Sequence, residues 1–203
     1  MNDDPTSVRL LLADGRTLGW CELGASDGRP VMAFHGTPAC RLLFAPAAGP
    51  AQRLGLRLIV PDRPGYGYSD PQAHRTLADW SADTGALMDH LGIDTAPILA
   101  VSGGGPYAVA AASQLGSRIS GLALVSPLGE VGAPSASAVI SRMERGFFLG
   151  LPKAPRLAAR RPRPAGPRSW PPRAVRRLVC SKFIATPTAA HSRHRLVAKR
   201  SWP

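Results

Sequence analysis

Short apolar runs recur along the first 125 residues and alternate with stretches of helical periodicity. Residues 7–23 alternate loosely between apolar and polar positions around the pair Asp14-Gly15, which predicts a β-hairpin. Further apolar runs bounded by glycine or proline predict buried strands at 30–34, 56–60, 97–101 and 119–125.

Two segments predict helices, and a further helix-compatible stretch lies between the runs at 30–34 and 56–60. From residue 76 to 91 apolar side chains recur at helical spacing, Asp79 follows Thr76 as in a capping box, and Gly92 supplies the stop. Residues 106–115 are rich in alanine and begin with proline. Short strands alternating with helices predict an α/β fold with a mostly parallel sheet of about six strands.

The formal net charge of +12 is concentrated at one end of the chain. Residues 1–150 carry 11 basic and 13 acidic side chains, whereas residues 151–203 carry 14 basic side chains and no acidic one. The first segment therefore has a balance of −2, and the high average charge does not describe it. A hydrophobic content of 44% is enough to bury a sizeable core, which excludes disorder throughout.

The start of the chain carries Asp3 and Asp4 and lacks a basic region followed by an apolar run, so no secretory signal is predicted. No stretch approaches the roughly 18 apolar residues of a membrane span. The cysteines form no Cys-x-x-Cys pair, so no metal site is predicted. We expect a cytoplasmic protein that uses no cofactor.

The junction between the strand at 97–101 and the helix at 106–115 carries the clearest chemical signal. In a nucleophile elbow the serine occupies a sharp, strained turn, so the residues two before it and two after it must be small. Ala100 and Gly104 meet this requirement around Ser102, with alanine where the usual pattern has glycine. A glycine-rich phosphate loop fits less well, because the segment lacks Gly-Lys-Ser/Thr and the Gly-x-Gly-x-x-Gly spacing. We therefore predict that Ser102 is a catalytic nucleophile.

The turn at 35–38, with sequence His-Gly-Thr-Pro, follows the strand at 30–34. Acyl hydrolysis needs two hydrogen-bond donors for the oxygen that becomes charged in the tetrahedral intermediate. The backbone N–H groups of Thr37 and Gly103 are the predicted donors. His35 is interpreted as a residue that holds the loop rather than as the general base.

Three motifs in order, at 35–38, 62–69 (Asp-Arg-Pro-Gly-Tyr-Gly-Tyr-Ser) and 100–106, make the chain resemble the α/β-hydrolase superfamily. The similarity runs from about residue 8 to 125 and is greatest to cofactor-free serine hydrolases with a His-Gly-x-Pro turn. It implies an α/β-hydrolase fold and hydrolysis of a small-molecule ester, amide or lactone. It also implies that Asp62 and Arg63 shape the loop after their strand.

The catalytic acid and base are not identified. In this superfamily the order is serine, acid, histidine, and the residues that follow Ser102 offer only Glu130, Glu144, His191 and His194. Both histidines lie among cations with no strand nearby, and Glu130 is interpreted as a solvated loop residue rather than a displaced acid. No sequence pattern after residue 125 predicts the last two strands of the fold. The sequence therefore does not indicate whether this chain is active, which substrate it takes or what its oligomeric state is.

We divide the chain into a partial hydrolase domain at 1–150, with the start of a cap at about 130–150, and a basic tail at 151–203 that is expected to be disordered. Seven prolines between residues 151 and 175 disfavour helix and central strand. The favoured hypothesis for the tail is that it is translated from an out-of-frame end of a GC-rich coding sequence, because it occupies the positions at which the last two strands of the fold are expected.

Two alternatives remain for the tail: a Pro-rich linker, or a basic arm that binds nucleic acid or anionic membrane. In the second case the chain would be a non-catalytic binding protein, with Trp170 and Trp202 available for stacking on bases. No nucleic-acid-binding module is recognised, so nucleic acid is not the expected partner. A sheet that stops after its sixth strand would leave an exposed edge.

Overall fold

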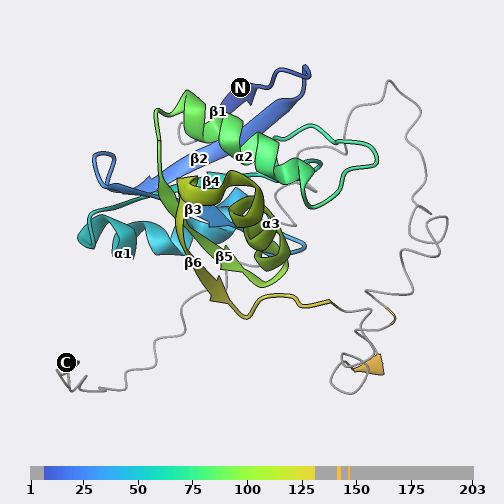
Figure 1. The fold of residues 1–203 in the computed structure, drawn as a ribbon. Helices are drawn as coiled ribbons and strands as arrows, with labels where there is room; N and C mark the ends of the chain where they lie inside the picture. Colours follow the sequence, from blue (N-terminus) through green and yellow to red (C-terminus); the bar gives the residue numbers. More distant parts are fainter. Residues whose placement is uncertain (1–6, 131–140, 143–145, 147–203) are drawn as a thin grey trace, which may run out of the picture.

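The computed structural model describes residues 7–130, 141, 142 and 146. Predictions about the basic tail, the cap, Glu144, His191 and His194 lie outside these residues. The predicted strands are all present, as β1 (Ser7–Leu11), β2 (Thr17–Gly24), β3 (Arg29–Phe34), β4 (Leu56–Pro61), β5 (Ala96–Val101) and β6 (Ile119–Val125). They form one sheet in the order β1-β2-β4-β3-β5-β6, as Figure 1 shows.

The sheet is mixed and mostly parallel, as predicted. The hairpin of β1 and β2 is antiparallel, and β2 also pairs antiparallel with β4. The pairs β3–β4, β3–β5 and β5–β6 are parallel. The carboxyl ends of β3, β4 and β5 therefore meet at one edge of the sheet, and this is where the three sequence motifs begin.

Helices cover both faces of the sheet (Figure 1). The longer ones are α2 (Asp79–His90) and α3 (Gly105–Leu115), and the others are η1 (Arg41–Ala47), α1 (Ala48–Arg53), η2 (Ser102–Gly104) and η3 (Gly116–Arg118). The side chains of β3 show how the two faces differ. Met32 and Phe34 belong to the core cluster that contains residues of α2 and α3. Ala33, between them, belongs to the cluster on the other face, with residues of η1 and α1. This alternation is the period of two expected of a strand buried on both faces.

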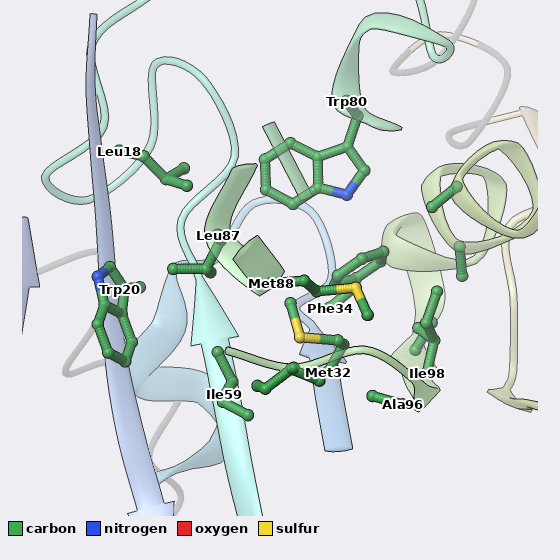
Figure 2. Packing of buried hydrophobic residues seen from close by; sticks show 14 of the residues in the cluster. Leu18, Trp20, Met32, Phe34, Ile59, Trp80, Leu87, Met88, Ala96 and Ile98 are labelled. Carbon is green, nitrogen blue, oxygen red and sulfur yellow. The ribbon is translucent and has the colours of Figure 1, made fainter. Parts of the chain in front are cut away.

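The larger core cluster is built around aromatic and sulfur-containing side chains (Figure 2). The rings of Phe34 and Trp80 meet edge to face with their centroids 5.4 Å apart, and Met32 and Met88 are fully buried in the same cluster. Edge-to-face contact suits the charge distribution of aromatic rings. The contact between Trp80 and Phe34 fixes α2 against β3.

The start of α2 differs from the prediction. Asp79 does accept hydrogen bonds from the backbone N–H and the hydroxyl of Thr76, at 2.6 and 2.9 Å. The helix nevertheless begins at Asp79 rather than at Thr76, and Leu77 is 44% exposed instead of facing the core. The prediction that the helix includes Leu77 is therefore wrong. Apolar residues in the turn before a helix can follow the helical spacing without packing on the core.

Strand β6 lies at one edge of the sheet, paired with β5 on one side within the described residues. Leu122, Leu124 and Val125 are 40–49% exposed. Unpaired strand edges with apolar side chains favour association between copies. Within the described residues, no helix has the length and apolar character needed to cross a membrane.

We expect Leu122→Lys to reduce self-association of the chain severalfold, because a charged side chain on an edge strand opposes pairing with another chain. Light scattering across a concentration series measures the effect. Val109→Lys is the matched control, since Val109 is 52% exposed against 41% for Leu122 but lies on α3. Unchanged association in Leu122→Lys would show that this edge is not the contact.

Candidate active site

Ser102 lies directly after β5, at the first position of η2, which leads into α3. Its φ is +50°, a left-handed conformation that is uncommon for residues other than glycine. Strain of this kind persists only where the surrounding structure enforces it, and it is frequent at catalytic positions. The sharp strand-to-helix turn predicted at this serine is therefore present.

Glycines allow neighbouring backbones to approach this turn. A Cβ atom on Gly104 would lie 2.5 Å from the carbonyl oxygen of Phe34 and 2.9 Å from that of His35. A Cβ on Gly36 would lie 3.2 Å from the Cβ of Ser102 and 3.7 Å from its Oγ. The end of β3 and the 35–38 turn consequently pack directly against the serine.

Thr37 and Gly103, the predicted oxyanion donors, come from different motifs but lie side by side. A Cβ on Gly103 would be 2.6 Å from Oγ1 of Thr37 and 3.2 Å from its backbone nitrogen. Gly103 is buried, and the peptide bond between Thr37 and Pro38 is cis. The structure thus brings Ser102, Gly103 and Thr37 together at the carboxyl edge of the sheet.

Arg63 fixes the 35–38 turn through hydrogen bonds to three of its residues. Its guanidinium donates hydrogen bonds to the carbonyl oxygen of His35, to that of Gly36 at 3.0 Å and to Oγ1 of Thr37 at 2.8 Å. Arg63 is 1% exposed, and burial lowers its pKa. Sequence reasoning placed this arginine in a loop-shaping motif but gave no sign of these three bonds.

His35 is completely buried and both of its ring nitrogens have partners. Nδ1 lies 2.9 Å from the carbonyl oxygen of Gly36, and Nε2 accepts the backbone N–H of Arg63 at 3.3 Å. Burial, followed by the positive charge of Arg63, lowers the pKa of His35 to about 3. The ring is therefore neutral and committed to the loop, as the sequence interpretation expected.

The neutral His35 makes the stability of the fold depend on pH. In the unfolded chain the pKa of this side chain is about 6.5, so the unfolded state binds a proton first as the pH falls. We expect the free energy of unfolding to decrease between pH 6.5 and pH 3. Urea denaturation between pH 7 and about pH 5.5 measures the first part of this decrease, while carboxyl groups remain almost entirely ionised.

His35→Gln is the control for this pH dependence, because the amide can hydrogen-bond with its neighbours but does not titrate. The slope of unfolding free energy against pH should be smaller in this variant than in the parent chain. Equal slopes in both proteins would mean that other groups cause the dependence.

Asp62 organises the loop that carries Arg63. Its carboxylate is fully buried and accepts hydrogen bonds from the backbone N–H and the guanidinium of Arg41, each at 2.7 Å, and from the backbone N–H of Tyr68 at 2.9 Å. A Cβ on Gly67, whose φ is +51°, would lie 1.9 Å from this carboxylate. The structural interpretation of Asp62 and Arg63 is thereby confirmed.

The loop after β6 reaches the serine, which the sequence did not indicate. The backbone N–H of Leu128 donates to the carbonyl oxygen of Ser102 at 2.9 Å, and a Cβ on Gly105 would lie 2.6 Å from Cβ of Pro127. Glu130 follows in the same loop and is exposed. It is a solvated loop residue in the described structure, as the sequence interpretation favoured.

Comparison with known proteins places this arrangement in a family. The profile described as the alpha/beta hydrolase fold matches residues 29–163, two thirds of the chain. The chain belongs to the α/β-hydrolase family. Membership confirms the resemblance drawn from the three motifs and explains the six-stranded, mostly parallel sheet.

Individual relatives agree with this assignment. An uncharacterized hydrolase of Bacillus subtilis is 33% identical over 120 residues, which are 59% of this chain and 41% of that protein. The crystal structure of a hypothetical protein from Pseudomonas aeruginosa aligns with a TM-score of 0.58 and 28% identity, over 79% of this chain and 56% of that one. An esterase from Exiguobacterium antarcticum aligns with a TM-score of 0.52 and 27% identity, over 59% and 45%. This α/β hydrolase spans about half the length of the relatives it matches.

The described residues do not supply a base for Ser102. Of the described histidines, His35 is committed to its loop, and His74 and His90 lie on the surface. No hydrogen bond joins any of the three to the serine hydroxyl within the described residues. The same part of the chain contains no cluster of side chains suited to a metal ion.

Proposed function

We propose that this α/β hydrolase cleaves small acyl compounds, such as esters, amides or lactones, through Ser102 as the nucleophile. The observation that carries the proposal is the left-handed serine at the junction of β5 and η2, packed against the 35–38 turn. The hydroxyl of a serine in this position attacks the carbonyl carbon, and the acyl C–O or C–N bond breaks to release the alcohol or amine and leave an acyl-enzyme. Water then cleaves the acyl-enzyme to the carboxylic acid and regenerates the serine. Opening an epoxide through an alkyl-ester intermediate uses a carboxylate nucleophile, whereas the residue at this turn is a serine.

The backbone N–H groups of Thr37 and Gly103 are the proposed oxyanion donors. The two residues are adjacent across the turn, and Gly103 is followed by the helix α3, whose amino end favours developing negative charge. The esterase that aligns at 27% identity supports acyl chemistry as the reaction class. No metal or cofactor is needed for this reaction.

Activation of Ser102 requires a base oriented by an acid. The sequence candidates Glu144, His191 and His194 lie outside the described residues, so the proposal assigns neither role. Roles are therefore proposed for the nucleophile and the two oxyanion donors only.

The test is labelling of the full chain with a fluorophosphonate, which modifies activated serines. We expect an adduct on Ser102, recovered in the tryptic peptide 76–118, together with turnover of p-nitrophenyl butyrate and no turnover of styrene oxide. Mass spectrometry of the digest locates the adduct. A folded protein with neither adduct nor ester turnover would rule out acyl hydrolysis by this chain.

A further inference from the structure

Arg63 is a buried cation with an unusual set of partners. Within the described residues no ion pair joins it to a carboxylate, whereas the carboxylate of the adjacent Asp62 is paired with Arg41. The guanidinium is instead flanked by the rings of Tyr66 and Tyr107, whose centroids lie 5.0 and 4.8 Å from its central carbon. Its Nε has no hydrogen-bond partner among the described residues.

A buried charge is costly unless the surroundings compensate for it, and compensation here comes from neutral groups. Three of these groups belong to three consecutive residues of the 35–38 turn: two carbonyl oxygens and the hydroxyl of Thr37. The planar guanidinium offers several donors in a rigid fork, so it can bind three acceptors at once, which a lysine ammonium on a flexible stem does less well. The arginine thereby fixes the conformation of the turn.

We infer that Arg63 is the positioning residue of the proposed oxyanion site and that it also supplies there a positive charge that no carboxylate of the described residues neutralises. The inference rests on the proposed function. Fixing the carbonyls of His35 and Gly36 orients the peptide between Gly36 and Thr37, and with it the N–H group of Thr37. The side chain is buried and does not itself reach the substrate; it acts through the turn.

The positive charge adds to the positioning effect. Charge that develops on the substrate oxygen in the transition state is stabilised most by groups held in place beforehand in a low-dielectric environment. The substrate in its ground state carries no such charge. Arg63 therefore stabilises the transition state more than the bound substrate. Its replacement should lower kcat with little change in KM.

The experiment compares Arg63→Met and Arg63→Lys with the parent chain in ester hydrolysis. We expect Arg63→Met to lower kcat about 100-fold, the scale of losing an oxyanion donor, with KM within about threefold. Arg63→Lys keeps the charge but not the fork, and should recover no more than about a tenth of the parent kcat. Full activity in Arg63→Lys would overturn the positioning role.

Arg16→Met is the control for loss of a partly buried arginine. Arg16 lies in the turn between β1 and β2 and donates to both carboxylate oxygens of Asp83 in α2, at 3.0 and 2.6 Å. Among the described residues no hydrogen bond or ion pair joins it to the 35–38 turn. This variant should lose stability and keep kcat when assayed well below its unfolding midpoint. If Arg63→Met loses no more activity than Arg16→Met, Arg63 is only structural.

Hydrogen exchange separates failure of this inference from failure of the proposed function, because it needs no activity. Backbone amides of residues 34–40 should exchange at least about tenfold faster in Arg63→Met than in the parent chain and stay unchanged in Arg16→Met. If the parent chain is inactive and this difference is present, the proposed function fails and the positioning of the turn stands. Equal exchange in all three proteins would overturn the inference.

Discussion

Replacing Ser102 with alanine is expected to remove fluorophosphonate labelling and to lower ester turnover at least about 1000-fold, the scale seen when a catalytic nucleophile is deleted. The hydroxyl would form the covalent bond to the acyl group, so no neighbouring group can take its place. Steady-state hydrolysis of p-nitrophenyl butyrate and intact mass after labelling measure the two effects. The fold should persist, because alanine adds no atom to the turn.

Ser81→Ala provides the matched control. Ser81 is buried in α2, its hydroxyl has no hydrogen-bond partner within the described residues, and it lies in the same tryptic peptide as Ser102. This variant should label and turn over at the parental rate. An adduct that persists in Ser102→Ala and disappears in Ser81→Ala would show that Ser102 is not the nucleophile.

Strands β3 to β6 could be predicted because each is a short apolar run bounded by glycine or proline, whereas β1 and β2 were predicted from their alternation around Asp14-Gly15. Such a run, buried on both faces, needs apolar side chains at consecutive positions, and β3 sends Met32 and Phe34 to one core cluster and Ala33 to the other. Turn residues then confine each run to the length of a strand. The order of the strands in the sheet was not predicted, because it depends on pairing between segments that lie far apart along the chain.

The limits of the sequence interpretation lie in contacts between residues distant along the chain. The bonds from Arg63 to residues 35–37 span 26 to 28 positions, and the bond from Leu128 to Ser102 is made by a backbone amide, which carries no sequence signature. Local periodicity also misplaced Leu77 and the start of α2. Composition and spacing report burial and turns, but not which partner a buried polar group finds in the folded chain.

Gly104 illustrates where sequence and structure agree. The elbow pattern requires a small residue two positions after the serine, and the structure gives the physical reason. The nearest neighbours of a Cβ at this position would be backbone atoms of Phe34 and His35, which cannot rotate away as a side chain could.

Gly104→Ala is therefore expected to destabilise the fold by about 2 to 3 kcal/mol, the usual cost of overpacking a core. The melting temperature should fall by about 6–12 °C for a domain of this size. Ester turnover should fall as well, because the displaced backbone is the one that leads from β3 into the 35–38 turn. Thermal unfolding followed by circular dichroism measures the loss of stability.

Gly121→Ala is the control that isolates the steric cause. Gly121 lies in β6, has no positive φ, and a Cβ built on it meets no atom within 4 Å. Both substitutions add one methyl group and both restrict the unfolded chain equally, which by itself favours the folded state slightly. The melting temperature of Gly121→Ala should therefore equal or exceed that of the parent. If Gly104→Ala melts at the same temperature as Gly121→Ala, the close approach of the elbow to β3 does not hold in solution.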